Sequence, residues 1–249
     1  MTTKTPHAEV PAVLLNDNEI ADGIVRAVAL NRPTKRNALD TRTLIQLREA
    51  LFAADADPRV RAVVLHASGP AFCAGGDTSE FSSDQVDDIL ERAHIMADVL
   101  ALPQSISAPV IVAADGAALG AGAALALSGD IIIAGADFYL GYPELPRGTL
   151  PSLVMPSAIA RCGAQLAFDL VTTGRRLGTA EAHARGIVGR VAQTDTFAEA
   201  LELASTYATF DADTVSATKN LFYQQAALPL GAALVRGLES MSPSFQPTA

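Results

Sequence analysis

The sequence predicts an α/β fold in which parallel strands alternate with helices, followed by a helical C-terminal region. Short β-branched runs alternate with stretches whose apolar residues have helical spacing, a pattern typical of parallel sheets with right-handed crossovers. The 249 residues fit one large domain, and 49% of them are hydrophobic, which is enough for a sizeable core. We expect an α/β core over residues 1–190 and a helical appendage over residues 191–249.

The first half of the chain is expected to begin with a loose lead-in over residues 1–18, where prolines occur and no periodicity is visible. β-branched residues at 24–30 and again at 60–66 predict two strands. Between them, Asp40 can accept hydrogen bonds at the start of a helix that continues to about Phe52.

The second half is expected to continue the alternation and then to become mostly helical from about residue 152. An amphipathic stretch predicts a helix, two apolar runs predict strands, and an Ala- and Leu-rich segment between these runs predicts a short helix. The helical end should break at Thr173–Gly174 and contain one short strand. The amphipathic helix is expected at residues 84–102, the two apolar strands at 110–113 and 131–134, and the Ala- and Leu-rich helix at 122–128. The short strand in the helical end is expected at 187–191.

The composition argues against several classes of protein. A formal net charge of −9 disfavours a nucleic-acid surface. No segment has the roughly 20 uninterrupted apolar residues that a membrane span needs, and residues 1–10 lack the apolar core of a signal peptide. The two cysteines, Cys73 and Cys162, give neither a disulfide framework nor metal-ligand spacing. We therefore expect a cytoplasmic protein without a metal site and without nucleic-acid or membrane partners.

Two turns between a strand and a helix consist of residues with almost no side chain, at residues 74–77 (AGGD) and 119–122 (LGAG). Small residues let a ligand approach the main chain, and a helix N-terminus offers unpaired N–H groups. Two N–H groups that face one point would form an oxyanion hole. Each turn alone is also explained by tight turning or close helix–sheet packing, but the pair favours a site.

The third candidate feature is the carboxylate of Glu144, in the segment 141–148 that follows the strand at 131–134. Glu144 lies between Pro143 and Leu145, and an apolar surround would raise its pKa and fit it for proton transfer. An exposed loop carboxylate without a catalytic role is the alternative.

In order along the chain, these motifs resemble those of the crotonase (enoyl-CoA hydratase/isomerase) superfamily. The segment RPTKRNAL at 32–39 resembles the early motif of that family, and the two small-residue turns resemble its oxyanion turns. The segment 142–151 resembles its catalytic-glutamate loop, and residues 172–191 resemble a later conserved pattern of the family. The resemblance runs from about residue 20 to 225. It implies a fold of stacked β-β-α turns, a superhelix with a short helical appendage, assembled as a homotrimer or hexamer.

The resemblance also implies roles for individual residues. It places the oxygen of an acyl thioester between the N–H groups of Gly76 and Ala121 and assigns acid/base chemistry to Glu144. Lys35 and Arg36 correspond to positive charges near the phosphates of coenzyme A, which enters as part of the substrate and not as a separate cofactor. Asp77 is expected chiefly to cap a helix. The positions implied along the substrate site are Ala38, Ala74, Asp77, Gly120, Ala124 and Tyr142.

The sequence departs from the family pattern at Ala124. Hydratases of this family that use two glutamates carry the second one at this position, and alanine can neither hold the attacking water nor exchange a proton. The chain also has less helix at its C-terminal end than the family usually has. In the family this helix covers the acyl-CoA and packs on a neighbouring subunit.

The leading hypothesis is double-bond isomerisation of an enoyl-CoA in fatty acid metabolism, with Glu144 as the sole acid/base. One alternative is an enoyl-CoA hydratase or lyase in which another group, such as a tyrosine, holds the water. A decarboxylase or dehydratase of a polyketide cassette, acting on acyl-carrier-protein thioesters, is a second. A non-catalytic acyl-thioester-binding protein is a third, and Glu144 beside two intact turns favours an enzyme over this one. The sequence does not specify the acyl group.

Overall fold

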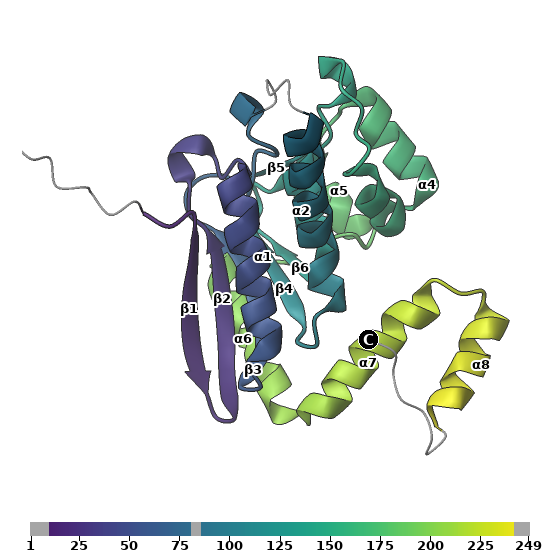
Figure 1. Cartoon of the computed structure of the whole chain (residues 1–249). Coiled ribbons are helices and arrows are strands. Elements are labelled where there is room, and N and C mark those ends of the chain that lie inside the picture. The colour runs from purple at the N-terminus through teal and green to yellow at the C-terminus, as the bar shows by residue number, and fades with distance from the viewer. Residues whose placement is uncertain (1–9, 81–85, 242–249) are drawn as a thin grey trace, which may run out of the picture.

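A six-stranded sheet dominates the computed structural model, which describes residues 10–80 and 86–241 (Figure 1). The strand order is β1-β2-β3-β4-β6-β9. β1 and β2 form an antiparallel hairpin, and all other neighbours run parallel. The strands are β1 (Val13–Ile20), β2 (Gly23–Leu30), β3 (Val60–Ala67), β4 (Val110–Ala114), β6 (Ile131–Ala134) and β9 (Arg190–Val191).

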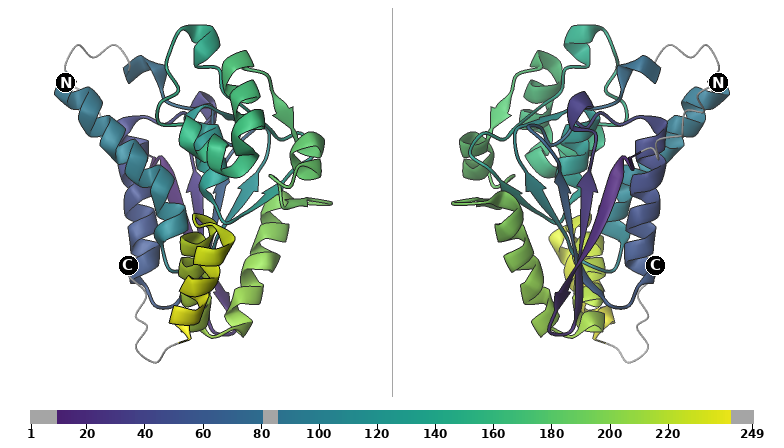
Figure 2. Two further views of the ribbon diagram at one scale, coloured as in Figure 1. Left: turned by 90° about the vertical axis from the view of Figure 1, so that its right-hand side faces the viewer. Right: turned by 90° about the vertical axis from the view of Figure 1, so that its left-hand side faces the viewer.

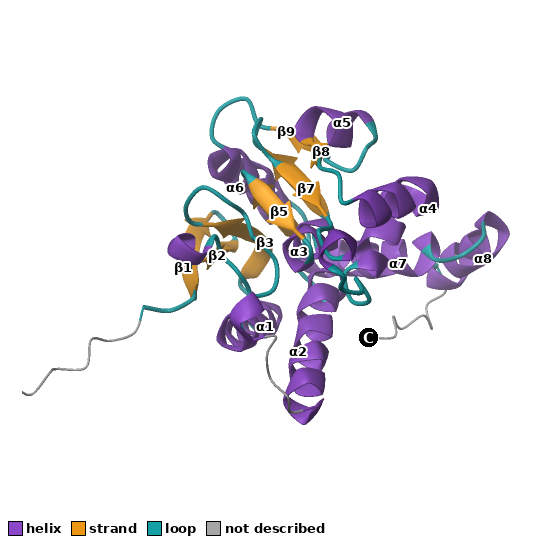
Figure 3. Cartoon of the chain, turned by 90° about the horizontal axis from the view of Figure 1, so that it is seen from above, coloured by secondary structure: helices purple, strands orange, loops and turns teal. Residues whose placement is uncertain are grey.

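The chain winds in repeated β-β-α turns, as the sequence predicts. After β4 come a short second strand, β5 (Ala117–Leu119), and the helix α3 (Ala121–Ser128). After β6 come β7 (Tyr139–Gly141) and the helix α4 (Met155–Thr173). The short strands form their own sheet with β8 (Leu177–Gly178), seen from above in Figure 3. The expected α/β superhelix is therefore confirmed.

Helices cover both faces of the six-stranded sheet, as the two views of Figure 2 show. On one face lie α1 (Thr41–Ala56) and α2 (Val86–Ser105), and their apolar residues join the main core. On the other face lies α6 (Thr196–Thr206), whose Ala200 and Leu203 pack in a smaller cluster with residues of β2, β3, β4 and β6. Because these strands are buried on both sides, they are apolar without alternation.

Most of the predicted elements agree with the structure. The strands expected at 24–30, 60–66, 110–113 and 131–134 are β2, β3, β4 and β6. Asp40 caps α1, since its carboxylate accepts a hydrogen bond of 2.8 Å from the N–H of Thr43. Gly174 ends α4 with φ +66° and donates its N–H to the carbonyl of Leu170.

The lead-in expected over residues 1–18 was wrong for its last part. Val13–Ile20 forms β1, which pairs with β2 along its whole length, from Val13 opposite Leu30 to Ile20 opposite Gly23. β1 is an edge strand and most of its side chains are exposed, so its sequence VLLNDNEI carries no regular alternation of apolar and polar residues. Residues 1–9 lie outside the part of the chain that the structure describes.

The later segment also differs from expectation. The short strand expected at 187–191 comprises only Arg190–Val191, and β8 was not predicted. Both are two-residue strands, too short to show a period, and the helix α5 (Thr179–Ala184) separates them. β9 and α6 contact the sheet although they begin at residue 190 or later. The division of the chain at residue 190 stays a prediction.

The chain ends in two helices, α7 (Ala212–Ala226) and α8 (Leu230–Ser240), which form an arm beside the sheet domain (Figure 1). The predicted helical appendage is thus present. α8 packs on α7 and leaves Leu230, Leu234 and Leu238 between 62% and 77% exposed. None of the helices in the described residues combines the length and apolar character needed to cross a bilayer.

Candidate active site

The two small-residue turns lie side by side. The N–H of Cys73 donates to the carbonyl of Ala117, and the N–H of Leu119 donates to the carbonyl of Cys73, each at 2.9 Å. A Cβ on Gly75 would lie 2.8 Å from the carbonyl oxygen of Leu119, and one on Gly122 would overlap the carbonyl oxygen of Cys73. These contacts explain why the turns consist of such small residues.

The N–H groups of Gly76 and Ala121 are both available to a ligand. Leu39 donates its N–H to Gly75 at 2.8 Å and accepts one from Asp77 at 2.9 Å. Backbone N–H and C=O groups of successive residues point to opposite sides of an extended segment, so the N–H of Gly76 points away from Leu39. Ala121 is the first residue of α3, where N–H groups lack a partner within the helix. Within the described residues, neither N–H makes a hydrogen bond.

The carboxylate of Glu144 lies against the second turn. Its loop is fixed there because the N–H of Gly120 donates to the carbonyl of Gly141, at the end of β7, at 2.9 Å. Glu144 is the N-cap residue of the single-turn 3₁₀ helix η3 (Leu145–Arg147). A Cβ on Gly120, which has φ +52°, would overlap the Oε1 atom of Glu144. Only a glycine at position 120 therefore leaves room for the carboxylate of Glu144 in this position.

Burial raises the pKa of Glu144, and its own backbone N–H and the charge of Arg147 counteract this only in part. The Oε2 atom is buried and has no hydrogen-bond partner among the described residues. A carboxyl group with a raised pKa, beside donors that can hold an oxyanion, is suited to take up a proton and return it.

A cavity of about 410 Å³ joins these groups. It is lined by both turns, by Glu144 and by an apolar wall that includes Met96, Leu150 and Leu153. Among the described residues, Glu144 is the only carboxylate that lines it. The structure therefore brings Gly76, Ala121 and Glu144 together, with Ala74 and Gly120 beside them.

Other predicted site residues lie outside the lining of this cavity. Ala124 is fully buried, one turn after Ala121 in α3. Tyr142 is also fully buried, and its hydroxyl has no hydrogen-bond partner in the described chain. Ala38 is half-buried in the segment before α1.

Lys35 and Arg36 are exposed, in and just after the 3₁₀ helix η1 (Pro33–Lys35). The carbonyl of Arg36 accepts a hydrogen bond of 2.9 Å from the N–H of Ala74, so this segment borders the first turn.

Asp77 has a structural role at the first turn. Its Oδ1 accepts hydrogen bonds from the N–H and the hydroxyl of Ser79 in the 3₁₀ helix η2 (Thr78–Glu80), and its Oδ2 pairs with Arg32 at 3.0 Å. The hydrogen bond from the Ser79 side chain holds the pKa of Asp77 below its usual value. Asp77 therefore holds the start of η2 and ties it to Arg32.

Two arginines line the cavity that were not predicted. Arg147 follows Glu144 by three residues, and Arg92 lies one turn before Met96 on α2. Arg92 pairs with Glu80 at 3.0 Å and donates a hydrogen bond to the carbonyl of Leu39 at 2.8 Å. The place of Arg147 three residues after Glu144 is a signal that could have found it, whereas no local signal related Arg92 to a predicted site position.

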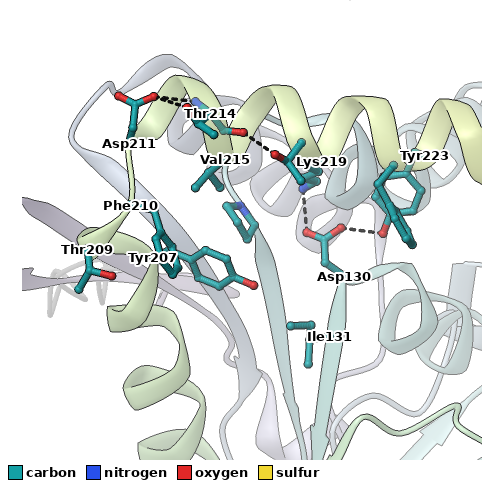
Figure 4. Close-up of a pocket in the computed structure, with 13 residues that line it drawn as sticks. Asp130, Ile131, Tyr207, Thr209, Phe210, Asp211, Thr214, Val215, Lys219 and Tyr223 are labelled. Atoms are coloured by element: carbon teal, nitrogen blue, oxygen red, sulfur yellow. Dashed lines mark hydrogen bonds and ion pairs between the residues drawn. The ribbon is translucent and has the colours of Figure 1, made fainter. Parts of the chain in front are cut away.

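A larger cavity of about 730 Å³ lies under α7 (Figure 4). Asp130 and Ile131 line it at the amino end of β6, the end of the sheet opposite the two turns. Lys219 pairs with Asp130 at 2.8 Å, and the hydroxyl of Tyr223 donates to the same carboxylate at 2.7 Å. Because these polar groups satisfy one another, we place the chemistry in the cavity beside Glu144.

Comparisons with known proteins agree with this geometry. A profile of the enoyl-CoA hydratase/isomerase family matches residues 19–244. A "probable enoyl-CoA hydratase" of Rhizobium meliloti is 36% identical over 218 residues, which cover 85% of this chain and 82% of that protein. The mouse "enoyl-CoA hydratase domain-containing protein 2, mitochondrial" is 36% identical over 78% of this chain, and the match spans 65% of the mouse protein.

Solved structures show the same fold. The crystal structure of an enoyl-CoA hydratase from Mycobacterium smegmatis superposes with a TM-score of 0.85 at 29% identity, over 94% of this chain and 93% of that one. The resemblance to the crotonase superfamily is therefore confirmed.

Proposed function

The chain belongs to the enoyl-CoA hydratase/isomerase family, and we propose that it isomerises the double bond of an enoyl-CoA, with Glu144 as its only acid/base. In this reaction the N–H groups of Gly76 and Ala121 hold the thioester oxygen. The carboxylate of Glu144 removes a proton from one carbon, the electrons delocalise into the thioester as an enolate, and the same carboxyl group returns the proton two carbons away. Each oxyanion donor of this kind contributes about 3–4 kcal/mol to such a step.

The observation that carries this proposal is the single carboxylate among the described residues of the cavity. A shuttle between two carbons of one substrate needs one base that becomes one acid. Addition of water needs, besides this, a group that orients the water. Ala124, where the two-glutamate hydratases of the family carry that group, has only a methyl side chain.

Hydration or a lyase reaction is the second candidate, because the relatives above carry hydratase names. In that case another group beside Glu144 holds the water. Retention of Glu144 beside both turns supports an enzyme over an acyl-thioester-binding protein, and over the polyketide decarboxylases, which lack this glutamate.

For the substrate we propose an acyl-CoA, with Lys35 and Arg36 near its phosphates and no further cofactor. Both side chains are exposed at the border of the first turn. An acyl-carrier-protein thioester is the alternative carrier. A homotrimer or hexamer, a place in fatty acid metabolism and a cytoplasmic location stay predictions, and the mouse relative carries a mitochondrial name.

A panel of 2-enoyl-, 3-enoyl- and 3-hydroxyacyl-CoA thioesters, followed by mass spectrometry and chromatography, distinguishes the candidates. Isomerisation leaves the mass unchanged, hydration adds one water and decarboxylation removes carbon dioxide. Glu144→Gln should keep the fold and the ligand affinity while kcat falls by at least ~10²-fold. A variant that keeps most of its activity would remove Glu144 from the mechanism.

A further inference from the structure

Two oxygens of the Glu144 loop are buried without a hydrogen-bond partner among the described residues: Oη of Tyr142 and Oε2 of Glu144. Tyr142 is 0% exposed, so its hydroxyl has no access to bulk solvent. Polar groups inside proteins are nearly always paired, and a bound water takes this role where no protein group does. Each of the two oxygens therefore needs a hydrogen-bond partner, and one bound water can serve both.

The two residues are near each other in the sequence and interact electrostatically. Tyr142 and Glu144 follow β7 in one loop, and this loop is tied to Gly120 at one end and to the 3₁₀ helix η3 at the other. The negative charge of Glu144 acts on the tyrosine: burial first, then the charges of Cys162 and Glu144, raise the pKa of Tyr142. Its hydroxyl is thus protonated at any physiological pH and can donate one hydrogen bond.

The two oxygens of Glu144 have different surroundings. A Cβ built on Gly120 would overlap Oε1, so this oxygen lies beside the second turn, whereas Oε2 is the buried, unpaired oxygen. The other ionisable groups around the pair are Cys162 on α4, Arg147 on η3 and Arg92 on α2. None of these groups forms a hydrogen bond with Oε2 within the described structure.

We propose that Tyr142 is a positioning residue that donates a hydrogen bond, through one bound water, to Oε2 of Glu144 and so leaves Oε1 to exchange the proton. This inference rests on the proposed function of Glu144. The relayed hydrogen bond stabilises the carboxylate and opposes the effect of burial. The resemblance implies that Tyr142 contacts the substrate, whereas in this proposal it acts on the substrate only through Glu144.

Tyr142→Phe tests the inference, because it removes only the hydroxyl and keeps the ring in the core. Tyr139→Phe is the matched control: Tyr139 lies on β7, just before the loop of Tyr142, and its ring packs beneath the guanidinium of Arg176, 4.4 Å away. The main measurement is the pH dependence of the infrared C=O band of protonated Glu144, identified by its loss in Glu144→Gln. It needs no turnover.

In Tyr142→Phe we expect the midpoint of this band to rise by roughly one pH unit, the effect of losing a hydrogen bond to a charged group. The acid limb of the kcat/KM profile should move in the same direction, kcat should fall by roughly three- to tenfold, and KM should stay within twofold. Tyr139→Phe should change none of these values. A change in thermal stability alone, with the Glu144 midpoint unmoved or lowered, would overturn the inference.

The two proposals can fail separately. If Glu144→Gln keeps its activity while Tyr142→Phe moves the infrared midpoint, the hydrogen bond is supported and the catalytic role of Glu144 is refuted. If Glu144→Gln is inactive while the midpoint stays unmoved, only the role of Tyr142 is refuted.

Discussion

An alanine at position 120 should displace the carboxylate of Glu144 without unfolding the protein. Gly120 has φ +52° and ψ −116°, a conformation outside the left-handed helical region in which a side chain costs about 1–3 kcal/mol. The new Cβ would also overlap Oε1 and lie 3.2 Å from the carboxyl carbon of Glu144. Resisting this overlap would cost ~1–3 kcal/mol more. Because the colliding group is the end of a flexible side chain, we expect Glu144 to turn away instead.

The expected result is therefore a modest loss of stability with a large loss of rate. A displacement of about 1 Å at a reacting group lowers the rate by about 10²-fold, so kcat should fall by at least this much. Denaturant unfolding should give a loss of about 1–3 kcal/mol, the cost of the backbone strain. Isomerisation of a 3-enoyl-CoA, followed by absorbance, gives kcat.

Gly186→Ala is the control for backbone strain. Gly186 also has a positive φ, +72°, but a Cβ there would meet no atom within 4 Å. It should lose stability through its backbone strain alone and keep its kcat. If Gly120→Ala is as active as Gly186→Ala, the proposed position of the proton-transferring oxygen is incorrect.

Three further predictions concern the surroundings of the site. Ala124→Glu places a carboxylate one turn after Ala121 in α3, so hydration of crotonyl-CoA should rise relative to isomerisation. Because the site is buried, the free energy of unfolding should fall by ~1–3 kcal/mol. A stable variant with an unaltered product ratio would contradict this. Replacing both Lys35 and Arg36 with Gln should raise KM for acyl-CoA several-fold and leave kcat unchanged, and an unchanged KM would argue for another phosphate site. Arg147→Gln removes a charge that lowers the pKa of Glu144, so this pKa should rise and the acid limb of kcat/KM should move to higher pH; a shift to lower pH would refute the assignment.

The sequence predicted the parts of the fold whose signals are local. The strands of the parallel sheet are buried on both faces, so their apolar runs are visible in the chain, and Asp40 marks the start of α1. β1 escaped prediction because the side chains of an edge strand face solvent. β8 and β9 comprise only two residues each and owe their conformation to pairing with β7 and β6.

Within the site, the small-residue turns and Glu144 could be identified because their motifs are contiguous. Their proximity comes from hydrogen bonds between residues far apart in the chain, such as those between Cys73 and β5. Arg92 and Arg147 were missed because an arginine on an amphipathic helix or in a loop is usually a solvated charge. The burial of Ala124 and Tyr142 outside the cavity lining depends on packing, which no local pattern reports.

The contact between Cys73 and the second turn also makes this residue an internal reporter. Cys73 is fully buried, and burial raises the pKa of its thiol to about 12, so alkylating reagents cannot reach or activate it in the closed structure. Its carbonyl accepts the N–H of Leu119 and its side chain lies against Gly122, so separation of the two turns would expose the thiol. The rate at which Cys73 reacts, compared with half-buried Cys162, would therefore measure how often the two turns come apart, and ligands that bridge them should slow that reaction.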